Sequence, residues 1–239
     1  MEFLTGLTPE ETLELEELLD ASRIGTEVRV RGAVHTIRDM GELSFVVLRK
    51  RDGLLQCIFE EGTTNYAVKD LREEMAVEIS GVLEEDARAP HGIEIRAREV
   101  KVFGRPYEAP PLPIGKWKLN TSLEAKLNYR STALRNVRER AKFRIQEGIV
   151  RGFRDFLYSQ HFTEIHTPKI GSKGAEGGSN VFKLDYFHRP AVLAQSPQFY
   201  KQMMVGVFER VFETAPVFRA EKHNTKRHLN EYTSLDFGM

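Results

Sequence analysis

The chain has 239 residues, a formal net charge of zero and one cysteine, and 41% of its residues are hydrophobic. This length suits two cores of usual domain size, whereas the balanced charge argues against a non-specific nucleic-acid coat protein and the lone thiol excludes an internal disulfide. No apolar run reaches the ~20 residues of a membrane helix, and the acidic residues 1–20 do not resemble an export signal. We therefore expect a soluble, cytoplasmic protein.

Residues 1–21 predict a short N-terminal helical extension. Thr8 can cap a helix in which Pro9 takes the first helical position and Glu11 lies three residues after the cap. Leucines at regular intervals follow as far as Asp20, so we expect a short acidic helix at residues 8–20.

Residues 22–104 contain five short segments in which apolar and polar residues alternate, as is typical of β-strands. The segments are 28–34, 43–48, 54–59, 76–82 and 93–100. Together with a helix expected at 67–74, they predict a small closed barrel of the OB-fold type. Such barrels bind single-stranded nucleic acid through exposed aromatic rings and basic side chains.

Several side chains of this barrel have the chemistry that binds RNA. Its positive charge comes from Arg29, Arg31, Arg38, Arg49, Lys50 and Arg51. Phe45 is able to stack on a base and Gln56 to hydrogen-bond a base edge. In an isolated barrel, a core position for Phe45 is the simpler expectation. Cys57 lies in an apolar run and is expected to pack rather than react.

Residues 105–130 predict an interdomain linker, because their four prolines favour extended backbone. Residues 131–239 follow as a second domain. Within it, residues 135–158 carry apolar side chains at helical spacing, which predicts one long amphipathic helix. The opposite face of that helix is basic, and is either solvated or a contact for a second subunit or for RNA.

Three motifs follow this helix. Residues 162–170 predict a strand that ends near Pro168 and requires a partner strand. Residues 171–180 contain four glycines and are either a flexible linker or a mobile loop able to approach a ligand closely. In residues 193–202, Pro197 is expected to start a helix with Gln198 and Lys201 on one face.

Residues 211–236 predict a long antiparallel hairpin, because two strand-like halves flank a polar loop. Arg219, His223, Arg227 and His228 gather near its bend. Forked guanidinium donors match phosphate oxygens, so this bend is a candidate phosphate site. The alternative is a charged and solvated hairpin tip.

The amino-acid sequence of this hairpin resembles that of a known family. Phe218-Arg219-Ala220-Glu221, followed by residues 227–231, is similar to the second signature motif of class II aminoacyl-tRNA synthetases, in the archaeal-type aspartyl and asparaginyl branch. Residues 162–170 resemble the first signature, which forms a dimer interface in that family. The resemblance implies an α+β protein in which an N-terminal OB-fold barrel precedes the first part of an antiparallel-sheet catalytic domain.

The resemblance implies that L-aspartate is attached to tRNA(Asp) through an aspartyl-adenylate by a homodimer, with ATP and Mg²⁺ as cofactors and no metal ligand assigned in this chain. ATP binding is implied for Arg219, Ala220, Glu221, Arg227, His228, Leu229 and Tyr232. Aspartate binding is implied for Glu176, Gln198, Phe199, Tyr200, Lys201, Arg219 and Asp236. Anticodon binding is implied for Arg38, Phe45 and Gln56.

Arg219 is the expected catalytic residue, because its guanidinium is able to bridge the attacking carboxylate and the α-phosphate of ATP. Lys201 favours aspartate over asparagine, since an ammonium pairs with the substrate's side-chain carboxylate and gains nothing from an amide.

Departures from the family pattern also bear on function. His35 and Pro90 stand where strictly tRNA(Asp)-specific members tend to have Trp and Lys, so we hypothesise that tRNA(Asn) is charged as well. Ala175 replaces a frequent Ser or Thr, and Gly238 replaces a Glu.

The third signature motif of the family is not found before Met239, so we expect a C-terminally incomplete enzyme. The main alternative is a non-catalytic, tRNA-binding fragment or paralogue. An asparaginyl enzyme is a weaker one, disfavoured by Lys201 and Asp236.

Overall fold

The structure, a computed structural model, describes residues 12–106, 108–174, 180–223, 225 and 228–239. The expectations for Thr8, Pro9, Glu11, Ala175, Glu176 and Arg227 lie outside these ranges. The chain divides into two compact units, the first ending at Ala141 and the second beginning at Lys142. No helix in the described ranges has the length and apolar character needed to cross a membrane.

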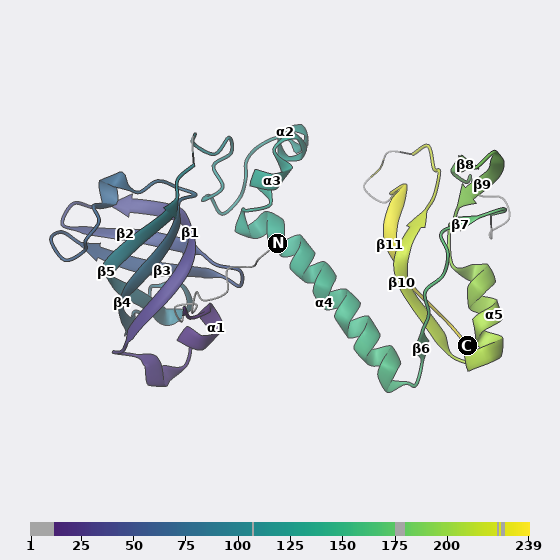
Figure 1. Ribbon diagram of the computed structural model, residues 1–239, viewed down its shortest axis with the longest axis horizontal. Coiled ribbons are helices and arrows are strands. Elements are labelled where there is room, and N and C mark those ends of the chain that lie inside the picture. The colour runs from purple at the N-terminus through teal and green to yellow at the C-terminus, as the bar shows by residue number, and fades with distance from the viewer. Residues whose placement is uncertain (1–11, 107, 175–179, 224, 226–227) are drawn as a thin grey trace, which may run out of the picture. The chain divides into compact units, whose positions relative to one another are not determined.

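Five strands close into a barrel in the first unit, as predicted (Figure 1). They are β1 (Glu27–Asp39), β2 (Leu43–Arg49), β3 (Leu54–Glu60), β4 (Ala76–Glu85) and β5 (Ile93–Gly104), and their order around the barrel is β1-β2-β3-β5-β4. Alternate side chains point inward, so Leu48, Leu55 and Cys57 are fully buried. Glycine is required at position 81, because a Cβ there would lie 2.1 Å from the carbonyl oxygen of Arg96 on β5.

Among the described residues, the helices beside the barrel strands are short: α1 (Leu15–Leu18) and the 3₁₀ turns η1 (Ala21–Arg23), η2 (Val68–Asp70) and η3 (Pro90–Gly92). The helix expected at 67–74 is reduced to η2, because Leu71 and Met75 instead bury their side chains in the barrel core. Of the helix expected at 8–20, the described part contains only α1. Its segment is held by Lys50, whose Nζ donates to the carbonyl oxygens of Leu13 at 3.0 Å and Arg31 at 3.1 Å.

The predicted linker folds into a second, smaller core that belongs to the first unit. Leu112, Ile114, Leu119 and Ala133 form this core, with α2 (Leu123–Asn128) and α3 (Arg130–Ala133) around it. The fully buried Asn136 donates from Nδ2 to the carbonyl oxygens of Ile114 and Lys116. Its Oδ1 accepts from the first backbone N–H groups of α4 (Val137–Ser159), so the same side chain fixes the linker and starts the helix.

The long predicted helix is confirmed as α4, but its apolar stripe is largely exposed among the described residues. Ile145 and Ile149 are 63% and 56% exposed. Only near its end, where Phe153 and Leu157 meet Phe212, does the helix join a core of the second unit.

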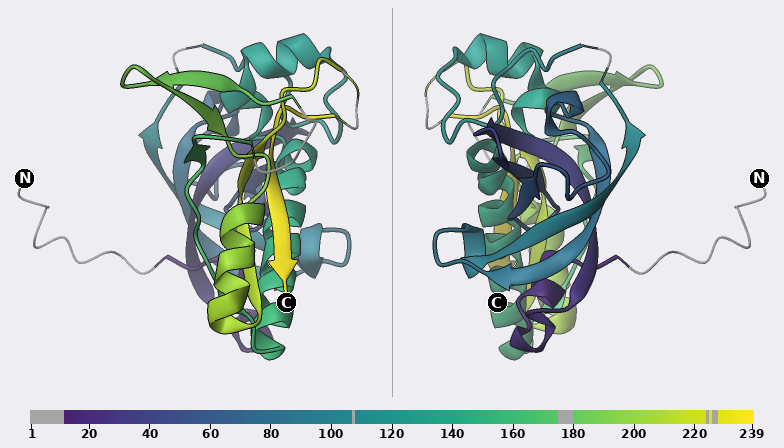
Figure 2. Two further views of the ribbon diagram at one scale, coloured as in Figure 1. Left: turned by 90° about the vertical axis from the view of Figure 1, so that its right-hand side faces the viewer. Right: turned by 90° about the vertical axis from the view of Figure 1, so that its left-hand side faces the viewer.

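The described residues of the second unit form two three-stranded sheets and one helix besides α4. The first sheet has the order β11-β10-β6, from β6 (Thr163–Glu164), β10 (Val211–Phe218) and β11 (Glu231–Gly238). The second has the order β7-β9-β8, from β7 (Ile170–Gly171), β8 (Lys183–Tyr186) and β9 (Arg189–Leu193). Helix α5 (Gln198–Phe208) lies along β10 and β11 (Figure 2).

The predicted hairpin is confirmed, because β10 and β11 pair antiparallel from Val211 opposite Gly238 to Phe218 opposite Glu231. Of the strand predicted to end near Pro168, β6 covers only Thr163–Glu164, and it pairs in parallel with β10, which supplies the expected partner strand. Pro168 lies between β6 and β7, where the chain passes from one sheet to the other.

Candidate functional site

The hairpin brings charged and aromatic side chains from both strands to one face. Its register places Glu213 opposite Asp236 and Val217 opposite Tyr232, and directly opposed side chains project to the same side. Arg219 follows Val217 by two residues, so strand alternation directs it to that side as well. Its guanidinium carbon lies 5.9 Å from the centre of the Tyr232 ring. A cation and an aromatic ring are thus presented together.

Asn230 holds the backbone around Arg219, a role that the sequence pattern did not single out. The Arg219 N–H donates to the Asn230 carbonyl oxygen at 2.9 Å. With its amide oriented to satisfy its neighbours, Asn230 donates from Nδ2 to the carbonyl oxygen of Glu221 at 3.0 Å. The turn propensity of asparagine at a hairpin bend was the available signal.

Helix α5 places an ammonium group against β11. Lys201 Nζ lies 2.7 Å from Asp236 Oδ1, and the two side chains are 17% and 20% exposed. The same nitrogen lies 3.4 Å from the carbonyl oxygen of Phe237. A Cβ at position 238 would lie 3.0 Å from Cδ of Lys201, so Gly238 leaves room for the aliphatic stem of this lysine.

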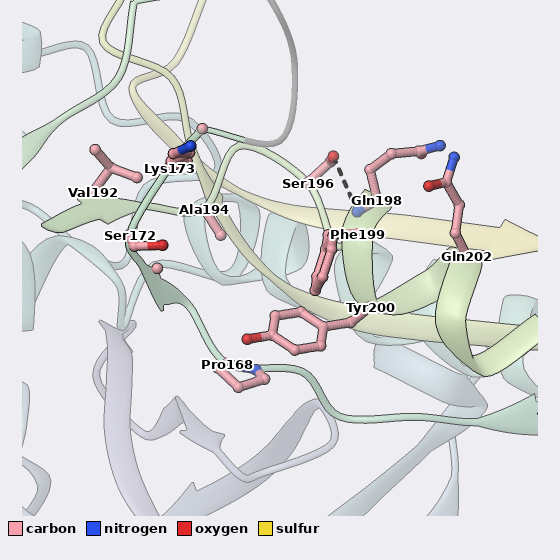
Figure 3. A pocket seen from close by; sticks show the side chains of 12 residues that line it. Pro168, Ser172, Lys173, Val192, Ala194, Ser196, Gln198, Phe199, Tyr200 and Gln202 are labelled. Carbon is pink, nitrogen blue, oxygen red and sulfur yellow. Dashed lines mark hydrogen bonds between the residues drawn. The ribbon is translucent and has the colours of Figure 1, made fainter.

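A cavity of about 470 Å³ lies beside the start of α5 (Figure 3). Gln198, Phe199 and Tyr200 line it, and the Tyr200 side chain extends toward Pro168. Lys201 and Asp236 do not line it. The predicted aspartate-binding residues are therefore divided between the cavity and the hairpin. Helix α5 begins at Gln198, and Lys201 follows three residues later, about one turn along the helix, which is the spacing predicted to place both side chains on one face.

Of the predicted phosphate-binding side chains, the described His223 and His228 lie close together at the bend of the hairpin. His228 Nδ1 lies 2.6 Å from Thr225 Oγ1, and its Nε2 lies 3.8 Å from Glu221 Oε2. The rings of His223 and His228 are 5.6 Å apart. Ala220 and Leu229 flank this cluster, with Leu229 62% exposed. Within the described ranges, no three His, Cys, Asp or Glu side chains form a group that could hold a metal ion.

Glu213 is buried beside Asp236 and ties the segment between β6 and β7 to the hairpin. Its carboxylate accepts from the N–H of Thr167 at 2.6 Å, the hydroxyl of Thr167 at 2.9 Å and the ammonium of Lys169 at 2.7 Å. These bonds fix both neighbours of Pro168, which lines the cavity. Sequence patterns could not indicate this role, because Lys169 lies 44 positions from Glu213.

The variant Glu213→Gln is expected to lower the free energy of unfolding of the second unit by about 3 kcal/mol or more, the usual cost of breaking a buried ion pair. Glu213 is 3% exposed and Lys169 is 18% exposed. The substitution would leave the Lys169 ammonium without its counter-charge. Urea unfolding followed by far-ultraviolet circular dichroism measures the loss. Glu147→Gln is the matched control, because its ion pair with Arg144 is exposed and should contribute less than about 1 kcal/mol. Equal losses in the two variants would contradict the role assigned to Glu213.

The barrel gathers the three predicted anticodon-binding residues on one outer face. Arg38 on β1 lies opposite Phe45 on β2, and Phe45 lies opposite Ile58 on β3. In the adjacent row, Gln56 on β3 pairs in register with Glu94 on β5, and its Nε2 donates to Glu94 Oε2 at 2.8 Å. Glu94 was not predicted, because parallel pairing with a distant strand leaves no local sequence signal. Phe45 is partly exposed, so the expectation of a core position is wrong.

Most of the positive charge expected to face RNA is already neutralised within the barrel. Arg31 pairs with Glu78 at 2.7 Å, and Arg49 pairs with Glu74 at 2.6 Å. Lys50 is only 6% exposed. Glu78 lies on β4 beside β1, whereas Glu74 lies in the turn before β4. Arg38 is an exposed cation beside Phe45.

His35 and Pro90, the two positions expected to bear on tRNA choice, differ in access to solvent. His35 is 2% exposed, and its Nδ1 has no hydrogen-bond partner among the described residues. Burial lowers the pKa of His35 to about 4, with a further lowering from the Arg49 and Arg140 guanidinium groups against an opposing effect of Glu74. Pro90 opens η3 and is partly exposed. Any effect of His35 on the choice of tRNA would therefore be indirect.

We expect His35 to make the first unit less stable in mild acid. Because the folded-state pKa lies below the usual value of 6.5, stability is complete above pH 6.5 and falls as the pH drops toward 4, by about 3 kcal/mol in total. Urea unfolding at pH 7.5 and pH 4.5 tests this, and His35→Gln should lose most of the difference. His91→Gln, at an exposed position of the same unit, should keep it. An unchanged pH dependence in His35→Gln would rule out this histidine as the source.

Comparison with known families identifies both units. Residues 122–239 match tRNA synthetases class II (D, K and N), and residues 28–103 match the OB-fold nucleic acid binding domain. The chain belongs to the class II tRNA synthetases. This assignment confirms the resemblance and the fold class read from the hairpin and barrel motifs.

Curated relatives of this synthetase chain include the aspartate–tRNA(Asp/Asn) ligases of Thermus thermophilus and Deinococcus radiodurans. The first is 46% identical over 218 residues, which cover 91% of this chain and 50% of the relative. The second is 47% identical over 215 residues, which cover 90% of this chain and 48% of the relative. The chain therefore spans about half the length of the curated relatives it matches.

Solved synthetase structures share the fold. The asparaginyl-tRNA synthetase of Pyrococcus horikoshii complexed with asparaginyl-adenylate gives a TM-score of 0.84 at 29% identity, over 95% of this chain and 52% of that one. A putative aspartyl-tRNA synthetase of Leishmania major gives a TM-score of 0.80 at 31% identity, over 99% of this chain and 49% of that one.

Proposed function

We propose that this chain binds ATP, L-aspartate and tRNA, and that it serves the ATP-dependent attachment of aspartate to tRNA(Asp) and tRNA(Asn). The observation that carries the choice of amino acid is the Lys201–Asp236 ion pair, with 2.7 Å between Nζ and Oδ1. The names of the curated relatives, which include both tRNAs, support the dual specificity.

Lys201 and Asp236 suit the two ends of an aspartate molecule. The ammonium would pair with the side-chain carboxylate of the substrate, and the carboxylate would accept from the substrate's α-ammonium group. Each group of the pair then exchanges its internal partner for one on the substrate, so neither charge is left alone in the partly buried site. An asparagine side chain offers no charge to Lys201, which favours aspartate.

Arg219 would serve the reaction by positioning and by neutralising charge. An oxygen of the aspartate α-carboxylate attacks the α-phosphorus of ATP, and the bond to pyrophosphate breaks. Both reactants are anionic, so a guanidinium between them lowers their repulsion and stabilises the charge of the transition state. Tyr232 would stack on the adenine ring and Glu221 would accept from its amino group. Mg²⁺ bound with ATP would help to neutralise the charge of the phosphates.

Transfer to RNA completes the proposed reaction. A ribose hydroxyl at the 3′ end of the tRNA attacks the carbonyl carbon of the aspartyl-adenylate, AMP leaves, and the hydroxyl loses its proton. Phe45 and Gln56 on the barrel would meanwhile bind anticodon bases by stacking and by hydrogen bonding. The proposal includes a homodimer, as the resemblance of residues 162–170 to the first signature implies.

The experiment that tests this proposal compares amino acids and then tRNAs. Exchange of pyrophosphate into ATP should depend on aspartate and not on asparagine, and purified tRNA(Asp) and tRNA(Asn) should both bind and be charged at similar efficiency. Exchange with asparagine alone would favour an asparaginyl enzyme. Binding of tRNA without any binding of ATP or aspartate would favour the RNA-binding module. Exclusive use of tRNA(Asp) would contradict the proposed use of tRNA(Asn) but not the attachment of aspartate to tRNA(Asp).

A further inference from the structure

The single tryptophan of the chain occupies an unusual position in the folded linker. Trp117 is 74% exposed, and it lies between Lys116 and Lys118, which are also exposed. None of the described residues places a ring or a cation on the Trp117 ring, and neither lysine has a described carboxylate within 4.0 Å. The segment thus presents one large aromatic surface and two ammonium groups to solvent, of which that of Lys116 interacts electrostatically with the Glu73 carboxylate.

The backbone that carries Trp117 is held on both sides. Ile114 and Leu119 are 0% and 2% exposed in the linker core. Asn136, also fully buried, donates to the carbonyl oxygens of Ile114 and Lys116. A Cβ at Gly115 would lie 2.4 Å from a methyl carbon of Thr36 on β1, so the segment rests directly on the barrel. A ring exposed on such a fixed segment loses little further entropy when a partner stacks on it.

We propose that Lys116, Trp117 and Lys118 form an RNA contact separate from the outer barrel face of Arg38, Phe45 and Gln56. The indole ring would stack on an unpaired base, and the two ammonium groups would approach phosphates. RNA fits better than a protein partner, because lysine is depleted in protein interfaces and stacking flanked by positive charge is the usual mode of single-strand recognition. This inference rests on the proposed function, which makes tRNA the substrate.

Because Trp117 is the only tryptophan, the fluorescence of the full chain excited at 295 nm reports on this contact alone. Titration with a tRNA(Asp) transcript, corrected for RNA absorbance, should quench the emission with the Kd obtained from anisotropy of end-labelled tRNA. Bound tRNA should also protect the ring from iodide. A blue shift that depends on protein concentration without RNA would show that a second copy covers the ring, and would overturn the inference.

Variants separate this contact from the barrel face. Trp117→Ala should weaken tRNA binding roughly 5- to 150-fold, the range for loss of one base stack, and Trp117→Phe should recover part of it. The pair Lys116→Ala and Lys118→Ala should reduce the salt dependence of log Kd by about one for each lysine. Leu123→Ala is the control, since Leu123 is 72% exposed but has no ring to stack. Circular dichroism melting confirms that each variant is folded.

The outcomes distinguish the RNA contact at Trp117 from the proposed binding of tRNA by the chain. If Phe45→Ala weakens tRNA binding whereas Trp117→Ala has no more effect than Leu123→Ala, the RNA-binding function stands and the contact at Trp117 is refuted. If the unaltered chain binds no tRNA, both are refuted.

Discussion

Replacing Arg219 with alanine is expected to lower aspartate-dependent exchange of pyrophosphate into ATP by roughly a thousand-fold, in line with the loss of one preorganised group that stabilises developing charge. The side chain lies 5.9 Å from the Tyr232 ring, and its backbone N–H is held by Asn230, so its position is set before ligand arrives. Arg219→Lys should recover little, because an ammonium is a point charge and lacks the fork that contacts carboxylate and phosphate together.

The Arg219 measurement requires a second readout that does not depend on turnover. Calorimetry with a stable aspartyl-adenylate analogue gives the Kd for each variant, and Tyr232→Leu serves as a control that removes stacking but no charge. Retention of most of the exchange activity and of analogue affinity in Arg219→Ala would exclude the residue from the reaction centre.

Replacing Lys201 with methionine is expected to weaken binding of the same analogue by about 2 to 5 kcal/mol, or roughly 30-fold to several thousand-fold in Kd. The change removes the counter-charge of the substrate's side-chain carboxylate and leaves Asp236 alone in a site where it is 20% exposed. Affinity for ATP without amino acid should change little, since the ATP residues lie on the hairpin bend and Arg219.

The matched control for this change is Lys183→Met, which removes an exposed lysine from β8 of the same unit. The double variant with Asp236→Asn shows how much of the loss arises from an isolated carboxylate. Selective loss of aspartate binding in Lys201→Met would support the assigned specificity. Equal weakening of aspartyl and asparaginyl analogues would remove Lys201 from the choice between them.

The elements that local pattern controls could be predicted from the sequence. Alternation and turn residues specified the barrel strands and the hairpin, and helical spacing specified α4. The hairpin prediction also brought Arg219, Tyr232 and Asp236 together, because antiparallel pairing converts sequence order into register. The contacts that local pattern does not control were missed: Glu213 with Lys169, Gln56 with Glu94, and Asn136 with the linker core.

The expectations for Lys50 and for residues 105–130 also missed contacts that local sequence pattern does not control. Lys50 was expected at the surface, but a long aliphatic stem let its ammonium reach two backbone carbonyls inside. Residues 105–130 were expected to be an interdomain linker with extended backbone because of their prolines. Proline content gave no indication that this segment would bury Leu112 and Ile114 in a small core of its own.

Cys57 is a chemical probe of how often the barrel core opens. The thiol is fully buried between β2 and β5, and burial raises its pKa well above the ordinary range, so it is inert while the strands remain closed. As the chain contains no other cysteine, its rate of alkylation in excess reagent counts how often the barrel core opens. Opening events in the rest of the molecule leave that count unchanged, so one mass-spectrometric time course isolates the motion of this core.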